Sequence, residues 1–246
     1  MQYLGIIPAR YASQRFPGKP LIEIRGVSMI RRVFEQALKT DILRHVVVAT
    51  DDERIYNHVK EFGDVVITSS EHPSGTDRCF EAARKMSKRW EISDTDVIVN
   101  IQGDEPFIQP QQIDHLCNCF HEPSTQIATL IKKIDDTEFV NDPNIVKVVT
   151  DQQKQALYFS RSPIPYNRNV TMQSGQQSVD YYKHIGMYAY RYGVLRDITQ
   201  LPPSSLELAE SLEQLRWIEN GFAIKTIITA TESLSIDTPE DLNYFD

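Results

Sequence analysis

The chain has 246 residues, of which 41% are hydrophobic and 24% are charged, and its formal net charge is -8 at pH 7. This length suits one large or two small domains, and the composition is typical of a globular protein with a substantial core. The acidic balance argues against a general nucleic-acid binder, and no apolar run approaches the length of a membrane span. The N-terminus lacks the positive segment of a signal peptide, and three cysteines do not make a disulfide framework. We therefore expect a cytoplasmic protein that binds no nucleic acid and does not insert into a membrane.

The first half of the chain alternates strands with helices. Near-continuous apolar runs predict strands at 3–7, 45–50, 64–68 and 96–102. Amphipathic stretches predict helices between them at 28–39, 53–62 and 76–90. This order predicts a parallel sheet covered on both faces, in which ligands bind beyond the carboxyl ends of the strands.

The second half has strands with stronger alternation. They are predicted at 127–134, 144–150, 156–161, 181–191 and 223–229. One helix is predicted over 205–220, and a last helix begins near 237, with Thr238 as its N-cap and Pro239 as its first residue. The polar stretch 167–180 is expected to be a loop.

The loop after the first strand, within "IIPARYASQRFPGKP", carries Arg10, Arg15 and Lys19 and no acidic residue. It is not a Walker A loop, because Pro20 follows Gly18-Lys19 where serine or threonine would be needed. Charged loops are usually solvated surface. At the carboxyl end of a strand, however, arginine can hold a phosphate in a bidentate fork, and lysine adds a mobile point charge.

Two short segments lie at the expected ends of other strands. Asp51 and Asp52 in "ATDDERI" are explained by an ordinary helix N-cap. The small residues of "HPSGTDR" (72–78) would let backbone N–H groups approach a base or phosphate, although they are also explained by capping of the helix through Ser74 or Thr76.

A third segment, "VNIQGDEPF", runs from an apolar strand into Asp104 and Glu105. Carboxylates at the end of a central strand are costly unless a cation or partner is present, and a hard divalent metal bridging phosphates would fit. Asp237 in "SIDTPED" lies one residue outside the predicted helix cap and is free to join such a site. Either aspartate alone is also explained by an ordinary turn position.

Nine blocks of this sequence resemble those of a known family, the 3-deoxy-manno-octulosonate cytidylyltransferases (CMP-Kdo synthetases), and occur in the same order and at matching spacing. The blocks are "IPARYASQRFPGKPL", "ATDD", "HPSGTDR", "VNIQGDEP", "DPNIVKVV", "YFSRSPIPY", "KHIGMYAYR", "AESLEQLR" and "IDTPEDL". The resemblance runs from Ile6 to about Leu242. Two stretches depart from the family pattern: "SSLELA" before the "ESLEQLR" block, and 167–180.

The resemblance implies an α/β fold: a three-layer α/β/α nucleotide-diphospho-sugar transferase fold, Rossmann-like, over one domain (1–246). A smaller lobe at about 155–200 would serve dimerisation and sugar binding, and the protein would be a homodimer. The implied reaction couples CTP with 3-deoxy-D-manno-octulosonate (Kdo) to give CMP-Kdo and diphosphate, for lipopolysaccharide biosynthesis, with Mg²⁺ as the cofactor.

The resemblance also implies roles for individual residues. The catalytic residues would be Lys19, Asp104 and Asp237, and the two aspartates would bind the metal. CTP would be bound by Arg10, Ser13, Arg15, Lys19, Ser74, Thr76, Arg78, Gln102 and Gly103. The sugar would be bound by Arg161, His184, Tyr188, Glu210 and Gln214.

Without the resemblance, several of these residues have ordinary explanations. A lone histidine or tyrosine in a strand is usually packed or hydrogen-bonded, which applies to His184 and Tyr188. Glu207, Glu210 and Glu213 would be the solvated face of a helix.

Three further functions stay open at this point. The first is a cytidylyltransferase for a related acidic sugar, such as an amino-Kdo or a sialic acid. It would share the nucleotide-binding half and differ in residues 155–216. A molybdenum-cofactor or hexose-1-phosphate nucleotidyltransferase also begins with an arginine-lysine loop, but lacks the "FSRSPIPY" and "ESLEQLR" blocks. The third is a nucleotide-binding regulator without activity, and retention of both aspartates argues against it.

Overall fold

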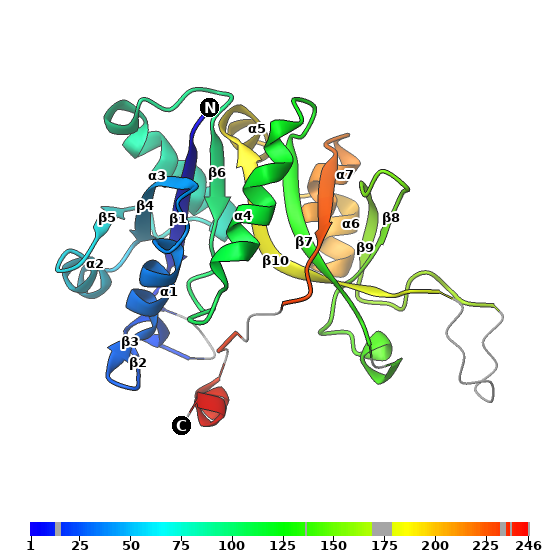
Figure 1. The fold of residues 1–246 in the computed structure, drawn as a ribbon, viewed down its shortest axis with the longest axis horizontal. Helices are drawn as coiled ribbons and strands as arrows, with labels where there is room; N and C mark the ends of the chain where they lie inside the picture. The colour runs from blue at the N-terminus through cyan, green and yellow to red at the C-terminus, as the bar shows by residue number, and fades with distance from the viewer. Residues whose placement is uncertain (13–15, 136, 169–178, 232–234, 237, 246) are drawn as a thin grey trace.

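The computed structural model describes the chain except residues 13–15, 136, 169–178, 232–234, 237 and 246. A mixed sheet forms its centre, with the strand order β11-β7-β10-β6-β1-β4-β5 (Figure 1). Most of the predicted loop 167–180 lies outside the described residues, so this prediction is not tested.

The strands predicted in the first half are confirmed and pair in parallel. They are β1 (Tyr3–Ala9), β4 (Leu43–Thr50), β5 (Asp64–Ile67) and β6 (Val97–Asn100). Beyond β6 the sheet is no longer parallel throughout. β10 (Tyr182–Arg191) runs antiparallel between β6 and β7 (Ile127–Lys133), and β11 (Ile224–Ile228) is parallel to β7.

A hairpin extends the second half of the sheet. β8 (Lys147–Thr150) and β9 (Ala156–Ser160) are antiparallel, and β8 also pairs with the start of β10. Figure 1 shows this hairpin beside the long β10 strand, on the side of the molecule away from β5. One strand, β10, therefore belongs both to the main sheet and to this extension.

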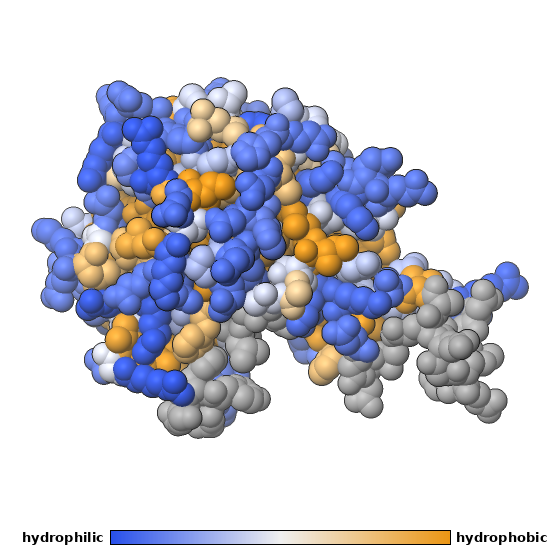
Figure 2. Space-filling view, in the orientation of Figure 1, coloured by the Kyte–Doolittle hydropathy of each residue, from blue (hydrophilic) through white to orange (hydrophobic). Residues whose placement is uncertain are grey.

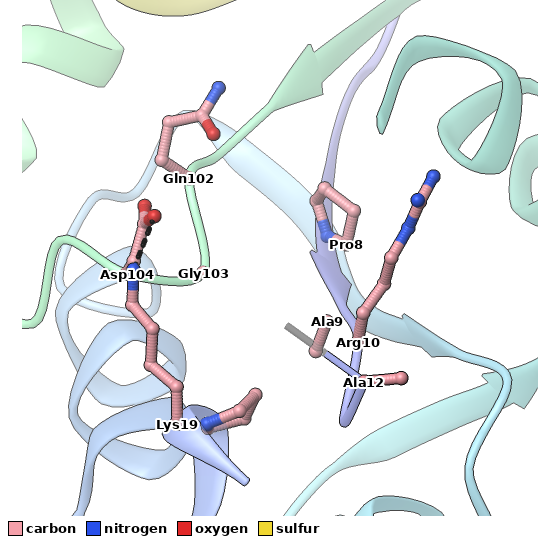
Figure 3. A pocket seen from close by; sticks show the side chains of 9 residues that line it. Pro8, Ala9, Arg10, Ala12, Lys19, Gln102, Gly103 and Asp104 are labelled. Carbon is pink, nitrogen blue, oxygen red and sulfur yellow. Dashed lines mark hydrogen bonds and ion pairs between the residues drawn. The ribbon is translucent and has the colours of Figure 1, made fainter. Parts of the chain in front are cut away.

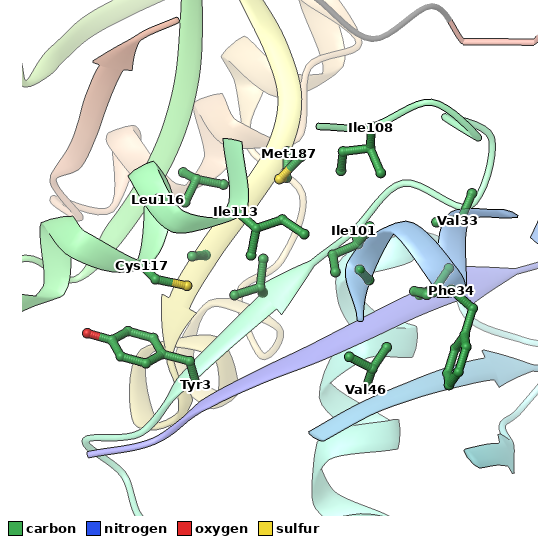
Figure 4. Packing of buried hydrophobic residues seen from close by; sticks show 14 of the residues in the cluster. Tyr3, Val33, Phe34, Val46, Ile101, Ile108, Ile113, Leu116, Cys117 and Met187 are labelled. Atoms are coloured by element: carbon green, nitrogen blue, oxygen red, sulfur yellow. The ribbon is translucent and has the colours of Figure 1, made fainter. Parts of the chain in front are cut away.

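Helices cover both faces of the sheet and create two cores. α1 (Met29–Ala37), α2 (Glu53–Val59) and α4 (Pro110–Asn118) pack on one face, where Figure 4 shows the interleaved side chains. α3 (Gly75–Trp90), α5 (Tyr192–Ile198) and α7 (Gln214–Glu219) pack on the other. Alternate residues of β1 enter opposite cores, because successive side chains of a strand point to opposite faces. The expected three-layer α/β/α fold is confirmed.

Several elements differ from the sequence predictions. The helix predicted over 205–220 is wrong as one element: α6 (Ser205–Glu210) ends and α7 begins at Gln214, with Ser211 between them in the left-handed region at φ 53°. The last helix is a 3₁₀ helix, Pro239–Phe245. Helices α4 and α5 were not predicted. Nor were short elements at Lys19–Leu21 (η1), Glu23–Ile24 (β2), Val27–Ser28 (β3), Cys119–His121 (η2) and Thr137–Asn141 (η3).

Two further expectations concern cysteines and membranes. All three cysteines are free, and Cys79 and Cys117 are buried in the two cores. In the described part of the chain, no helix has both the length and the apolar character needed to cross a bilayer.

Candidate active site

A polar cavity of about 440 Å³ opens where β1 and β6 end. Its lining includes Arg10 after β1, Lys19 from η1, and Gln102, Gly103 and Asp104 after β6. Figure 3 shows Lys19 with Asp104 on one side of the cavity and Arg10 on the other. The sequence predicted that these segments, which are about 90 residues apart, meet at the carboxyl edge of the sheet, and the structure brings them together there.

Lys19 and Asp104 form an ion pair in the cavity wall. Lys19 Nζ lies 2.8 Å from Asp104 Oδ2, and the two side chains are 10% and 33% exposed. The lysine is placed by the turn at Gly18, which has φ 73° and bonds back to the carbonyl of Tyr11 at 2.9 Å. A cation and a carboxylate therefore lie side by side in the lining of the cavity.

Gly103 sets the position of Asp104 because the chain passes very close to β1. A Cβ atom at this position would lie 2.6 Å from the backbone oxygen of Pro8, which is closer than real Cβ atoms approach. The glycine of the "QGDEP" motif is thus required by the approach of two backbones.

Three predicted site residues are not among those described: Ser13, Arg15 and Asp237. The neighbouring Ile236 is described, and its N–H donates to the carbonyl of Asp104 at 3.0 Å. The segment that leads to Asp237 therefore runs against the cavity wall. Among the described residues, no three His, Cys, Asp or Glu side chains converge as a metal site.

The "HPSGTDR" segment forms the start of α3 beside the cavity. Ser74 is the N-cap and accepts from the N–H of Asp77, which confirms the capping interpretation of this segment. The hydroxyls of Ser74 and Thr76 also donate to Glu213, at 3.0 and 2.8 Å. A Cβ on Gly75 would lie 3.7 Å from Pro8, so the helix N-terminus lies against the end of β1.

Arg78 lies inside the protein and not among the residues that line the cavity. Its side chain is 0% exposed, and it donates to Thr68 Oγ1 at 2.6 Å and to Asp51 Oδ2 at 3.0 Å. Asp51 thus has a charged partner, whereas Asp52 caps α2 as expected by accepting from the N–H of Arg54. Arg78 joins the residues that follow β4 and β5, Asp51 and Thr68.

An irregularity in β10 brings the second half of the chain to the same edge. The pairing of β10 with β7 shifts between Ile185 and Tyr188, and Gln102 Nε2 donates to the carbonyl of Gly186 at 2.6 Å. Gln102 therefore connects the cavity with β10, where the predicted sugar residues His184 and Tyr188 are found.

His184 and Tyr188 belong to an aromatic cluster. The His184 ring packs on Phe159 and Tyr188, with ring centroids 5.2 Å away in both cases, and its Nε2 lies 3.0 Å from Thr129 Oγ1. Tyr188 is 7% exposed and also packs edge-on against Trp217. Both side chains are therefore packed, as expected for aromatic residues in a strand, and His184 is also hydrogen-bonded, whereas the Tyr188 hydroxyl has no partner among the described residues.

Burial lowers the pKa of His184 to about 3, from an ordinary value of 6.5. Between these two values the unfolded chain binds a proton that the folded chain does not, so the contribution of His184 to the free energy of unfolding falls as the pH drops below 6.5. We expect its imidazole signals in NMR spectra to stay constant from pH 8 to pH 5. A titration of His184 with a midpoint near 6.5 would contradict this expectation.

Arg161 and Glu210 form a cluster where β9 and α6 end. The Glu210 carboxylate accepts from Ser160 Oγ at 2.6 Å and from the N–H of Arg161 at 2.9 Å. The Arg161 guanidinium donates to the carbonyls of Glu210 and Pro143, at 2.7 and 3.0 Å. Glu210 is thus paired with the protein and is not part of a solvated helix face.

Glu213 was not among the predicted site residues. It lies in the break between α6 and α7, where it accepts from both hydroxyls of the α3 start, and burial raises the pKa of its carboxyl. The adjacent Gln214 is 5% exposed, and among the described residues its Nε2 has no hydrogen-bond partner. The break brings Glu213 against the start of α3 and leaves Gln214 buried. The prediction of one continuous helix with a solvated face did not anticipate this placement.

A cavity with two cations and a carboxylate, at the carboxyl edge of an α/β sheet, is suited to a phosphorylated ligand and fits a nucleotidyltransferase. The chain belongs to the cytidylyltransferase family, whose family model matches residues 4–227, and more narrowly to its 3-deoxy-manno-octulosonate cytidylyltransferases.

The similarity to individual relatives covers almost the whole chain. The 3-deoxy-manno-octulosonate cytidylyltransferase of Parabacteroides distasonis is 56% identical, over 98% of this chain and 96% of its own. The enzyme of Phocaeicola vulgatus is 55% identical, over 98% of this chain and 95% of its own. A solved structure of CMP:2-keto-3-deoxy-manno-octonic acid synthetase complexed with CTP superposes with a TM-score of 0.91 at 42% identity, covering 99% and 96%. The family resemblance seen in the nine sequence blocks is confirmed.

Proposed function

We infer that the chain transfers the cytidylyl group of CTP to Kdo. The observation that carries this conclusion is the match at 55–56% identity, over nearly the full length, to 3-deoxy-manno-octulosonate cytidylyltransferases. In the reaction the anomeric oxygen of Kdo bonds to the α-phosphorus, the bond from that phosphorus to the β-phosphate oxygen breaks, and diphosphate leaves. These relatives favour Kdo over an amino-Kdo or a sialic acid. They give no support to a hexose-1-phosphate or molybdenum-cofactor nucleotidyltransferase, or to a regulator without activity.

The cavity supports binding of the triphosphate. Arg10 and Lys19 supply positive charge from two sides of a space of about 440 Å³. In the transition state, charge develops on the leaving diphosphate, and fixed cations stabilise it more strongly in a cavity than in water. The predicted cytosine segment, which contains Ser74 and Thr76, starts α3 beside this cavity.

Magnesium is the cofactor we propose. One carboxylate, Asp104, lines the described cavity, and Ile236, the residue before Asp237, bonds to the backbone of Asp104. A site with only one or two protein carboxylates suits Mg²⁺, because this ion keeps several waters and takes phosphate oxygens as its other ligands. When bound, the ion supplies charge neutralisation for the phosphates and lowers the pKa of a coordinated hydroxyl. Lys19 holds Asp104 in place and would turn to the phosphates when CTP enters.

The sugar is proposed to lie between the cavity and the second half of the chain. Gln214 presents a buried amide donor that lacks a partner in the described structure, and leaving such a donor unpaired costs about 1–3 kcal/mol. A polyhydroxylated sugar can supply the missing acceptor. His184 and Tyr188 lie at the β10 irregularity, which Gln102 connects to the cavity.

Arg161→Ala is expected to raise the KM for Kdo about tenfold and to lower the melting temperature. The guanidinium donates to the carbonyls of Glu210 and Pro143, so its loss leaves these groups unpaired and loosens the sugar side of the site. The dissociation constant for CTP, measured by calorimetry, should stay near that of the wild type. If the substitution weakened the binding of CTP and of Kdo equally, Arg161 would act only on the fold.

We also propose that the protein is a homodimer. Large apolar side chains are exposed in the second half of the chain: Phe139 (51%), Leu157 (58%), Tyr166 (88%) and Leu208 (69%). In Figure 2, apolar surface gathers over β7 and β11 and again where β10 begins. Burial of such residues in a second copy would remove them from water. Light scattering should give twice the monomer mass of 28.3 kDa, and a monomer at micromolar concentration would contradict the proposal.

The function is tested by diphosphate release with CTP and a panel of acidic sugars. We expect rapid release with Kdo and at least about tenfold lower kcat/KM with sialic acid. A preference for another acidic sugar would overturn the substrate assignment, and release without any sugar would indicate a hydrolase.

A further inference from the structure

The segment 69–72, between β5 and α3, is attached to α3 by one carboxylate. Glu81 Oε2 accepts from the N–H of Ser69 at 2.8 Å and lies 2.5 Å from Nε2 of His72. Glu81 Oε1 lies 2.8 Å from Lys85 Nζ, one turn farther along the helix. The Glu81 side chain is only 13% exposed. A single, largely buried side chain thus holds both ends of this segment.

The same segment also holds the arginine of the cavity. Arg10 Nη2 donates to the backbone carbonyl of His72 at 2.7 Å, and Arg10 lines the cavity (Figure 3). A guanidinium has five N–H donors, so this bond leaves others available for a phosphate. The direction in which Arg10 points therefore depends on where the His72 carbonyl is placed.

Glu81 is ionised over the working range of pH. Burial raises the pKa of its carboxyl, but hydrogen bonds from Lys85, from the Ser69 N–H and from His72 outweigh this and lower the pKa to about 2. Hydrogen bonds to a charged acceptor are shorter and stronger than neutral ones. The attachment of the segment is therefore firm, and a neutral side chain of equal size would weaken it.

We propose that Glu81, acting through His72, is a positioning residue that orients Arg10 for the triphosphate of CTP. Neither residue is among the described residues that line the cavity, so the effect on the nucleotide passes through Arg10. This inference rests on the proposed function in one respect, namely that Arg10 binds phosphate.

A double-mutant cycle on CTP affinity tests the role. Calorimetry would compare the wild type with Glu81→Gln, Arg10→Ala and the double variant. We expect Glu81→Gln to weaken CTP binding about fivefold to tenfold, the effect of losing one well-placed hydrogen bond. In the Arg10→Ala background, Glu81→Gln should have no further effect, because the residue through which it acts is absent.

The matched control is Glu35→Gln, which breaks an exposed ion pair with Arg31 at the same i,i+4 spacing on α1. It should leave CTP affinity unchanged. If Glu81→Gln fails to fold, His72→Ala enters the same cycle with the same expectation. The positioning role is overturned if Glu81→Gln weakens CTP binding equally in the wild-type and Arg10→Ala backgrounds, or if it does not weaken CTP binding at all. A wild-type protein that binds no CTP overturns the proposed function first, and this role with it.

Discussion

Asp104→Asn is expected to lower kcat by at least about 100-fold while the protein stays folded. The change removes the charge of the one described carboxylate in the cavity, at the proposed Mg²⁺ site, with little change in size. Metal stabilisation of the transition state amounts to several kcal/mol, and each 1.36 kcal/mol is about tenfold in rate. Steady-state kinetics with saturating CTP and Kdo would measure the effect.

Two comparisons make this result specific. Asp64→Asn removes a carboxylate from an exposed ion pair with Arg89 and should leave kcat unchanged. Asp237→Asn, at a residue outside the described part of the chain, should match Asp104→Asn. Wild-type activity should also disappear with EDTA and return with Mg²⁺. Full activity in excess EDTA, or normal turnover of either site variant, would remove the metal from the mechanism.

Gly103→Ala is expected to impair both stability and turnover. The new methyl group would meet the backbone oxygen of Pro8 at 2.6 Å, and neither backbone can move without shifting Asp104 or the end of β1. Overpacking of this kind costs about 1–3 kcal/mol, which lowers the melting temperature of a chain of this size by roughly 2–12 °C. We expect kcat to fall at least about tenfold even at temperatures where the variant is fully folded.

The control for Gly103→Ala is Gly26→Ala. Gly26 has φ 75° but no atom within 4 Å of an added Cβ, and it is not among the residues that line the cavity, so this variant strains the backbone outside the site. It should lose stability and keep its kcat. If Gly103→Ala behaved in the same way, the close approach of the two backbones would not be what places Asp104.

The parallel half of the fold could be predicted from the sequence because its signals are local. Apolar runs marked β1, β4, β5 and β6, and the rule for the carboxyl edge then brought Arg10 and Asp104 together although they are distant in the chain. Helix α4 could have been found as well. Pro110 stands at its first position, and Ile113, Leu116 and Cys117 recur at helical spacing.

Other features depend on contacts that no local pattern records. The break between α6 and α7 requires Ser211 in the left-handed region, a conformation that serine adopts only when the surrounding structure imposes it. With a continuous helix assumed, Glu213 appeared to be a surface residue, whereas it accepts hydrogen bonds from Ser74 and Thr76 across the site. Arg78 likewise matched a family motif, but its burial against Thr68 and Asp51 follows from the packing of α3 on the sheet.

Phosphorus NMR of the complete reaction tests the central claim most directly, because it identifies the bond that breaks. With CTP, Kdo and Mg²⁺, we predict that the three CTP resonances disappear together. Equal amounts of diphosphate and of one new phosphodiester, the linkage between CMP and the anomeric oxygen of Kdo, should replace them. Formation of CDP with orthophosphate, or of free CMP that does not depend on Kdo, would contradict the account.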